Sequence, residues 1–559
     1  MAASSSDAQP GGGASESDEE RQRRAERERR FWGNAPPGLH SIVMAFVPIH
    51  LLIQLQLPPL AWQHAVRKQH HLTISAADED QRSFWQRTTI DLVGEWATYL
   101  RQLTTIVLRY PFGFPRWCFD VFVAIIEGHI AGRRAANLTG GTLETIAIER
   151  GVRLTGTARQ SVARTNPPLP APLDPPPTLH ALTTIAGLWG DDHEVLADRR
   201  WLMPSLAVVR QEGWDAGSLG QFIGSSRSLR CVDGMWMFDG DEWASVFEGI
   251  PAAPAGPQGG PLAQLERIGT ILVWGDNPTG IERLQEVLMA RGCRGSLKQL
   301  DVQFCPRFFI GRPTMRVLLA LDRLATSVSY FFTEDGLTDP HTDPSPAAID
   351  IASTLSFDKA TSVEVKNAYE FHPPANTPSP HPAIIAHMQP FPEASELSVR
   401  SKLGGAAGRL LADKMPKKVG RVDIERVSGA EEKVGVLASL GTAREVRTVQ
   451  MGDIGVDQLE QLLVGAADEL PTIKRLYFDL TVPDGVEDAG SFVRTQLLSV
   501  IPRIRGLQCV ELRVKTTTAE QRDSLVTCIP VGTNIGSFTV RRISGYVGTW
   551  VTMTAVRNA

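Results

Sequence analysis

The sequence has few cysteines and no closely spaced cysteine pair. Its six cysteines stand at positions 118, 231, 293, 305, 509 and 528, and none belongs to a CxxC motif. This spacing excludes the dense framework of a small disulfide-stapled domain and the ligand pattern of a structural zinc site. We therefore expect all six thiols to be reduced and unpaired, as in an intracellular protein.

The sequence also lacks a secretory signal and an apolar run long enough to cross a bilayer. Residues 1–20 are rich in Ser, Gly and acidic residues instead of apolar ones. The longest apolar stretch, residues 42–60, is interrupted by Pro48, His50 and Gln54, which are costly in a bilayer core. The sequence therefore predicts no contact with a membrane. It leaves open whether the protein lies in the cytoplasm or in the nucleus.

An excess of basic charge is absent, because 57 Lys and Arg face 62 Asp and Glu. A surface that binds nucleic acid would be predominantly basic, so we expect no nucleic-acid partner. With 559 residues the chain is too long for one compact core. Several domains or one elongated array are expected instead.

Motifs that carry catalysis or hold a cofactor are missing as well. There is no phosphate-binding glycine loop, nucleophile elbow, HExxH motif or kinase motif set. The acidic and histidine-containing segments 191–194 and 339–343 stand in polar or proline-rich connections without a second cluster of metal ligands. We therefore expect a protein without enzymatic activity, cofactor or bound metal.

A repeated phrase fills most of the chain beyond residue 100. It reads apolar-x-x-apolar-x-apolar, as in a half-buried strand, and it follows an amphipathic stretch. Two further candidates, Leu182/Ile185 and Leu229/Val232, lose the third apolar position to Gly187 and Gly234. The twelve full instances are Leu103/Ile106/Leu108, Leu143/Ile146/Ile148, Ile268/Ile271/Val273, Leu297/Leu300/Val302, Ala325/Val328/Tyr330, Ala360/Val363/Val365, Ala394/Leu397/Val399, Val419/Val422/Ile424, Val446/Val449/Met451, Ile473/Leu476/Phe478, Leu507/Val510/Leu512 and Ile535/Phe538/Val540.

The intervals between these strands carry helical patterns, for example in residues 278–288, 457–464 and 491–500. Strands joined by helical crossovers pair in parallel. The sequence thus predicts an α/β solenoid of strand–helix units over residues 101–559, with a mainly parallel sheet and helices on its outer face. A proline-rich break at residues 333–346 leaves two arrangements open, one continuous sheet or two lobes.

The N-terminal residues differ from the array. Residues 1–33 are a low-complexity tail, acidic and then basic, for which we expect disorder. Residues 34–100 carry apolar residues at helical spacing and predict a small helical region, followed by a likely strand at Leu72-Thr73-Ile74.

One repeat resembles the signature of a cysteine-type leucine-rich repeat. Leu297, Leu300, Val302 and Cys305 occupy the positions of that signature, whereas the other units carry unrelated residues at the cysteine position. The array therefore resembles a degenerate leucine-rich-repeat protein. This resemblance implies a horseshoe-shaped solenoid that binds a protein partner.

The region before the array carries Leu39, Ile42, Val43, Leu51 and Leu55 at helical spacings, followed by Trp62. This pattern resembles an F-box, a short helical motif that docks onto the adaptor of cullin-based ubiquitin ligases. His40 stands where the motif usually has proline, and Pro58-Pro59 interrupts its last helix. As a whole the chain resembles a large multi-copy family of single-celled algae with an F-box-like start and degenerate repeats, which implies no activity. The alternative reading is that these residues cap the open end of the array. The residues that would bind the adaptor are Leu39, Ile42, Val43, Leu51, Leu55 and Trp62.

The side chains between the apolar positions of the repeats should point away from the helices and form a partner-binding face. This face carries both charge signs, which favours a protein partner. The sequence therefore indicates a non-catalytic interaction scaffold, with an F-box-type substrate receptor of a ubiquitin ligase as the alternative. The candidate binding residues are Asp301, Glu364, Arg475, Tyr477 and Glu511.

The equivalent position is apolar in the early units, where Val107, Ala147 and Leu272 stand. An exposed apolar row is unfavourable in water, so we expect Val107 to be buried, with residues 34–100 as the nearest cover.

Overall fold

The computed structural model describes residues 47, 49–54, 66–76, 78–110, 117–150, 169, 171–188, 192–211, 215–234, 238–252, 259–273, 278–293, 297–304, 325–332, 346–367, 382–400, 405–427, 429–454, 466, 468–483, 485–486, 488–500, 504–545 and 550–558. The chain divides into two compact units. The first comprises Met1–Gly187 with Asp198–Ser205, and the second comprises Leu188–Ala197 with Leu206–Ala559. Residues 1–33, for which disorder is expected, lie outside the described residues, as do residues 333–345.

The first unit contains a parallel sheet in which β1, β2, β3 and β4 pair in chain order. Helix α5 packs against β1, α7 packs against β2, and α6 packs closely along α7. The strand expected at Leu72-Thr73-Ile74 is confirmed as β1. The elements are α3 (Ile49–Gln54), β1 (His71–Ser75), α5 (Glu79–Arg87), α6 (Ile90–Ala97), β2 (Thr105–Tyr110), α7 (Trp117–Ala135), β3 (Thr145–Arg150) and β4 (Thr184–Leu188).

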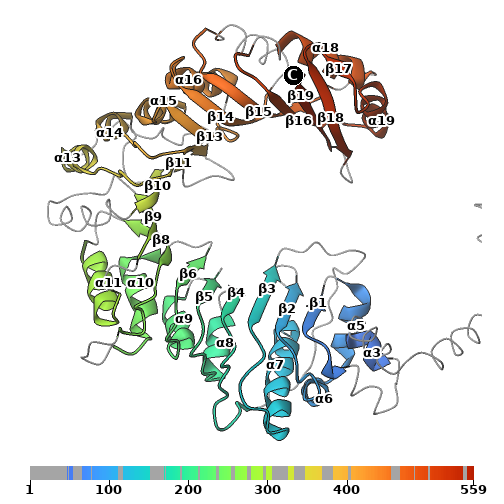
Figure 1. Cartoon of the computed structure of the whole chain (residues 1–559), viewed down its shortest axis with the longest axis vertical. Coiled ribbons are helices and arrows are strands. Elements are labelled where there is room, and N and C mark those ends of the chain that lie inside the picture. The colour runs from blue at the N-terminus through green and yellow to red at the C-terminus, as the bar shows by residue number, and fades with distance from the viewer. Residues whose placement is uncertain are drawn as a thin grey trace, which may run out of the picture. The chain divides into compact units, whose positions relative to one another are not determined.

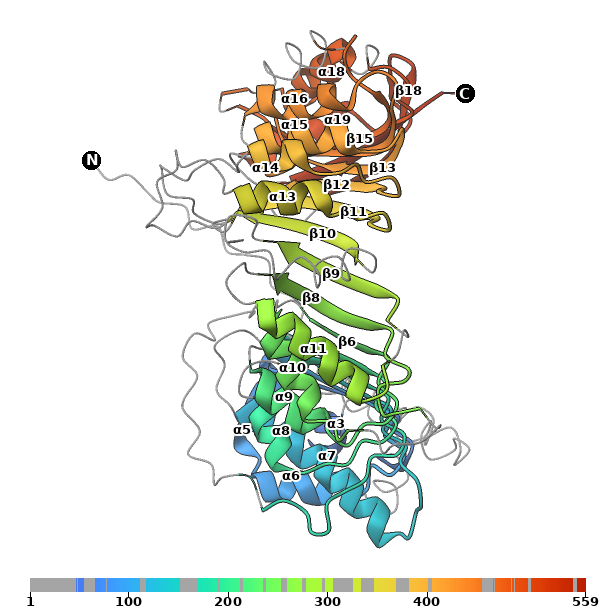
Figure 2. The same ribbon diagram turned by 90° about the vertical axis from the view of Figure 1, so that its left-hand side faces the viewer.

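The second unit repeats the strand–helix alternation many times, as in a solenoid-like repeat protein (Figure 1). Neighbouring helices α13, α14, α15 and α16 contact one another in succession, and Figure 2 shows them stacked along the sheet. The elements are α8 (Asp192–Asp198), β5 (Val208–Gln211), α9 (Ala216–Ile223), β6 (Cys231–Gly234), β7 (Phe238–Asp239), α10 (Gly240–Glu248), β8 (Arg267–Val273), α11 (Pro278–Ala290), β9 (Gln299–Phe304), β10 (Ala325–Phe332), α13 (Pro346–Thr354), β11 (Ser362–Asn367), α14 (Pro382–His387), β12 (Glu396–Arg400), α15 (Gly405–Lys414), β13 (Lys418–Asp423), α16 (Ala430–Leu440), β14 (Glu445–Asp453), β15 (Thr472–Thr481), α18 (Ala489–Val500), β16 (Cys509–Lys515), α19 (Ala519–Cys528), β17 (Asn534–Ile535), β18 (Phe538–Gly545) and β19 (Trp550–Arg557).

The sheet of the second unit is parallel from β5 to β16. Strand β6 pairs with β5 and β8, and the strands then follow in chain order to β16. Strand β10 pairs with β9 on one side and β11 on the other, so strand pairing is continuous on both sides of residues 333–346. The predicted α/β architecture with a mainly parallel sheet is thereby confirmed.

The last predicted repeat differs from the others. The phrase Ile535/Phe538/Val540 falls on β17 and β18, which are antiparallel to each other. Strand β18 also pairs in antiparallel fashion with β19, and β19 lies antiparallel against β16. The prediction of a parallel strand here was wrong because the short connections between these strands leave no room for a helical crossover.

Two predicted strands with incomplete patterns are present. Ile185 lies in β4 and Val232 in β6, with Leu182 and Leu229 just before these strands, although Gly187 and Gly234 replace the third apolar residue. At both positions a side chain would collide with the neighbouring strand. A Cβ on Gly187 would lie 1.8 Å from the Ile148 carbonyl oxygen, and one on Gly234 would lie 2.0 Å from that of Gln211. The glycines therefore allow close strand pairing.

Side-chain caps fix the starts of several helices. Asp78 and Thr89 accept hydrogen bonds from main-chain N–H groups in the first turns of α5 and α6. Asp239 forms a reciprocal capping box with Glu242 at the start of α10. These caps satisfy N–H groups that have no partner within the helix.

Burial follows the predicted pattern along the early strands in part. Val107 is buried, as predicted, and it lies opposite Thr73 of β1 and Ala147 of β3. Ala147 and Leu272 are only half-buried. Strand β1, which belongs to residues 34–100, thus pairs beside Val107. That residues 34–100 cover the Val107 side chain stays a prediction.

Candidate functional site

One side of the second unit's sheet faces away from the helices, and we call it the open face (Figure 1). The strands carry polar side chains at the positions that point to this face. These side chains alternate with core residues along each strand. On β12, Leu397 and Val399 are buried, Ser398 between them is half-buried, and Arg400 is exposed. The open face therefore follows directly from the two-residue period of the strands.

Parallel pairing aligns the open-face side chains in rows that run across the strands. In the central row each residue lies opposite the next, so neighbouring side chains are close enough to interact. Three predicted binding residues, Glu364, Tyr477 and Glu511, belong to this row. From β11 to β16 the central row is Glu364, Ser398, Asp423, Gln450, Tyr477 and Glu511.

A second row lies two residues earlier on each strand, and it contains the other two predicted binding residues, Asp301 and Arg475. The sequence pattern had aligned Asp301 with Ser329, which is wrong, because Gln303 is the residue opposite Ser329. The register shifts between Ala325 and Ser327, and such irregularities displace a strand relative to its sequence phrase. The second row is Asp301, Ser327, Ser362, Glu396, Arg421, Thr448, Arg475 and Cys509.

Several carboxylates of the open face form ion pairs with arginines. Glu364 pairs with Arg400 at 2.8 Å, from Arg Nε to Glu Oε1. Asp301 pairs with Arg267 at 3.3 Å, and the same guanidinium pairs with Asp233 at 3.0 Å. Burial raises the pKa of Asp301, and the charge of Arg267 acts in the opposite direction. Glu364 and Asp301 are therefore already engaged within the protein.

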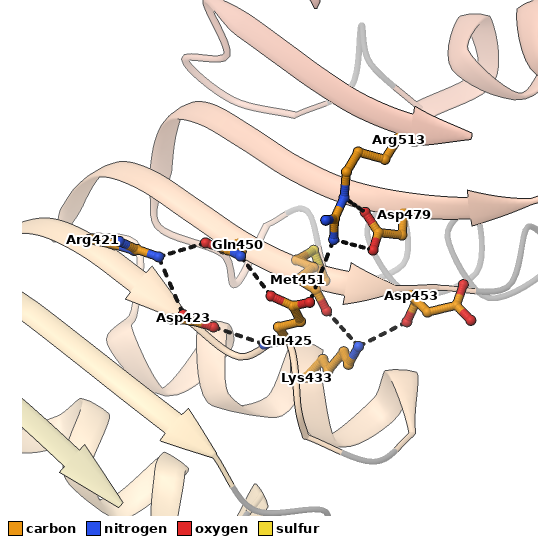
Figure 3. A network of polar contacts seen from close by, with 9 residues as sticks. All are labelled: Arg421, Asp423, Glu425, Lys433, Gln450, Met451, Asp453, Asp479 and Arg513. Atoms are coloured by element: carbon orange, nitrogen blue, oxygen red, sulfur yellow. Dashed lines mark hydrogen bonds and ion pairs between the residues drawn. The ribbon is translucent and has the colours of Figure 1, made fainter. Parts of the chain in front are cut away.

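A larger polar network lies at the carboxyl ends of β13 to β16 (Figure 3). Arg421 donates a hydrogen bond to Gln450 at 2.7 Å, and Gln450 donates to Glu425 at 2.6 Å. Glu425 also pairs with Arg513 at 3.5 Å. Arg513 binds Asp479 through two guanidinium nitrogens, and this bonding raises the pKa of Arg513. The network thus links four neighbouring strands.

Sequence reasoning did not name Glu425, Asp479 or Arg513 of this network, although the signal was present. Glu425, Asp479 and Arg513 stand two residues beyond the central-row positions 423, 477 and 511. Extending the same two-residue period by one step would have identified them as a third row of the open face.

Lys433 is a further residue that the sequence pattern did not single out. It projects from α16, is buried, and donates hydrogen bonds to the carbonyl oxygens of Met451 at 2.5 Å and Asp453 at 2.8 Å (Figure 3). Burial lowers the pKa of this amine, and the nearby carboxylates of Asp453, Glu425 and Asp479 oppose the shift. Lys433 therefore fixes the end of β14 against α16.

Arg475 differs from the other open-face arginines. Its side chain is exposed, and it has no ion pair with another described residue. Tyr477, two residues later, and Glu511, opposite Tyr477, are half-buried. Arg and Tyr, together with Trp, are enriched among the residues that contribute most to the binding energy of protein interfaces. The guanidinium of Arg475 is therefore accessible on the open face.

Of the six predicted adaptor-binding residues, only Leu51 is described; Leu39, Ile42, Val43, Leu55 and Trp62 lie outside the described residues. Leu51 is 40% exposed on α3, whereas its neighbours Ile49 and Leu52 are buried. Its side chain is therefore accessible to a partner.

The first unit also contains a buried ion pair that the sequence did not reveal. Arg199 donates to Glu127 on α7 through Nε at 2.6 Å, and Trp201 donates to the same carboxylate at 3.3 Å. Both charged residues are buried. The pair joins α7 to the segment Asp198–Ser205 within this unit.

Metal ligands do not cluster in the described part of the chain, in which no group of three His, Cys, Asp or Glu residues could hold an ion. Among the described helices none is both long and apolar enough to cross a membrane. Cys231, Cys509 and Cys528 are free thiols, and Cys305 lies outside the described residues.

The comparisons with known proteins identify no family. No family model matches the chain, and no curated protein matches it. A solved structure that matches is the crystal structure of the Rad7 and Elc1 complex in yeast, at 11% sequence identity and a TM-score of 0.25. The match covers 54% of this chain and 75% of that chain.

Proposed function

We propose that this protein is a non-catalytic scaffold of degenerate leucine-rich repeats that binds a protein partner through the open face of β11 to β16. One observation carries the proposal. The exposed Arg475, which has no ion pair with another described residue, stands two residues before Tyr477, in a surface where Glu364 and Asp479 are paired with Arg400 and Arg513. A pre-paired surface is rigid and loses little entropy on binding, which favours a specific protein partner.

The mixed charge of the rows supports a protein partner over a nucleic acid. Asp423 and Glu511 alternate with Arg421 and Arg475 in adjacent rows. A phosphate backbone would be repelled by the acidic members, whereas a protein surface of complementary pattern would be held in one register.

Site-specific photo-cross-linking tests this proposal. A photoreactive phenylalanine analogue replaces Thr448, which lies opposite Arg475 in the second row. In the matched control the analogue replaces Thr495, which is exposed on α18. We expect a discrete protein to cross-link in cell extract from position 448 and not from position 495.

The same cross-link should be lost in Arg475→Glu and kept in Arg494→Glu, since Arg494 is exposed on α18. Equal cross-linking from both positions, or a cross-link that survives Arg475→Glu, would show that the open face is not the binding surface.

The exposure of Leu51 favours a second candidate function, an F-box-type substrate receptor of a cullin-based ubiquitin ligase. In this case α3 would bind the ligase adaptor while the open face binds the substrate. Purified adaptor should then bind the full chain, and Leu51→Asp should abolish that binding. Leu92→Asp is the control, because Leu92 is similarly exposed, at 37%, on α6. Binding unaffected by Leu51→Asp would refute this role.

A further inference from the structure

The outermost strand of the second unit has an incompletely paired edge. Strand β18 pairs with β19 along its length, but on its other side only its first residues have partners. Asn534 and Ile535 pair with Thr539 and Phe538, and the Gly532 N–H donates to the Val540 carbonyl at 2.8 Å. Among the described residues, nothing pairs with this side of residues 541–545. Unpaired N–H and C=O groups of such an edge can bind another extended chain.

The charges on the strands next to this edge are basic. Strands β18 and β19 carry Arg541, Arg542 and Arg557 and no acidic residue. Arg541 and Arg542 are exposed on the open half of β18 itself. A segment that adds to this edge would therefore be held best if it is acidic.

An exposed apolar side chain lies beside the same edge. Val531 is 61% exposed, and it directly precedes Gly532, which is hydrogen-bonded to β18. A single apolar residue next to a row of unpaired main-chain groups gives an incoming strand an anchor for one of its own apolar side chains.

From these observations we infer that the open half of β18 is a strand-addition site for an extended acidic segment of a partner protein. The arginines have two effects there. They attract the acidic strand, and they disfavour edge-to-edge pairing with a second copy of this chain, because like charges would face each other. This site is separate from the open-face site around Arg475 and does not depend on it.

Fluorescence anisotropy with the full chain tests the inference. The probe is a short labelled peptide of alternating glutamate and threonine. We expect it to bind, and we expect binding to weaken by at least about tenfold when lysine replaces glutamate or when alternate peptide nitrogens are methylated. Methylation removes the main-chain hydrogen bonds without changing the charge, so it separates strand addition from simple charge attraction.

The variant Arg541→Glu/Arg542→Glu should reduce affinity by at least about tenfold, whereas Arg447→Glu, an exposed arginine on β14, should not change it. Circular dichroism melting confirms that each variant is folded. Equal binding of the methylated peptide, displacement of the probe by single-stranded DNA of equal charge, or a dimer of the chain that is lost in the double variant would each overturn the inference. None of these results depends on whether Arg475 binds its own partner.

Discussion

Arg513 on β16 and Asp479 on β15 lie opposite each other across adjacent strands, and the guanidinium Nε donates to the Asp479 Oδ1 at 2.6 Å. The carboxylate is nearly buried, at 12% side-chain exposure, whereas the guanidinium is half-exposed at 48%. The carboxylate therefore depends on the arginine for compensation of its charge.

Removal of this arginine should destabilise the second unit. We expect Arg513→Ala to lower the free energy of unfolding by about 1–3 kcal/mol, because it leaves the Asp479 carboxylate buried without its main partner. Urea unfolding measures the change. The control Arg522→Ala removes a pair with the exposed Asp523 and should cost less than about 0.5 kcal/mol. Equal effects of the two variants would contradict the argument.

Acidification should destabilise the first unit through His129. This imidazole is buried, donates a hydrogen bond from Nδ1 to the Leu100 carbonyl oxygen, and burial lowers its pKa to about 4. The unfolded chain, with a histidine pKa near about 6.5, then binds more protons than the folded chain between these values. Stability is thus lost as pH falls from about 6.5 to about 4, by up to roughly 3 kcal/mol.

The measurement for His129 is urea unfolding at about pH 7 and about pH 4.5 in the native chain and in His129→Gln. The variant should be less stable at the higher pH and should lose less stability on acidification. An unchanged pH dependence would show that other groups determine the acid sensitivity.

Replacement of glycine by alanine should destabilise the first unit to very different extents at two positions. Gly187 and Gly140 both have positive φ, at +80° and +72°, so alanine is strained at either position. Only at Gly187 would the new Cβ also collide with the Ile148 carbonyl, whereas no atom lies within 4 Å at Gly140. We expect Gly187→Ala to cost more than about 3 kcal/mol and Gly140→Ala about 1 kcal/mol, as measured by thermal melting. Similar costs would mean that the two strands can separate to admit the methyl group.

The buried pair of Glu127 and Arg199 should be strongly coupled. Arg199→Met leaves a buried carboxylate and should destabilise the first unit by about 3–5 kcal/mol. The double variant Glu127→Leu/Arg199→Met should be more stable than Arg199→Met alone, because no uncompensated charge remains. A double-mutant cycle of unfolding free energies measures this coupling, and additive effects would contradict it.

The repeated apolar phrase predicted most strands because each strand buries one face, and burial of that face requires apolar residues at a fixed spacing. It worked for β11 to β16, where residues such as Val363, Leu397 and Val449 are fully buried at the expected positions. It did not identify β5, β7 and β19. Strand β7 has only Phe238 and Asp239, too few residues to show a period.

The sequence could predict which residues of the open face lie opposite each other only where neighbouring strands pair in a regular register. Glu364, Tyr477 and Glu511 occupy one row because β11 to β16 pair without a shift that separates these positions. Asp301 could not be aligned from the sequence, since the shift between Ala325 and Ser327 depends on how two strands pair rather than on either strand alone. Glu127 and Arg199 are far apart in sequence, so no local sequence pattern predicts that they pair.

The antiparallel end of the second unit imposes an order on its assembly. Strand β19 follows β18 in the chain, yet it lies between β18 and β16 and pairs with both. Until β19 has joined β16, the hairpin partner β18 has no place in the sheet. Trp550–Arg557 must therefore be synthesised before Phe538–Gly545 can pair with the sheet. Until then one edge of β16 is unpaired. Each strand from β9 to β16 pairs with the strand made before it and can join the sheet as soon as it is made, so we expect completion of this sheet to be a late and separate step of folding.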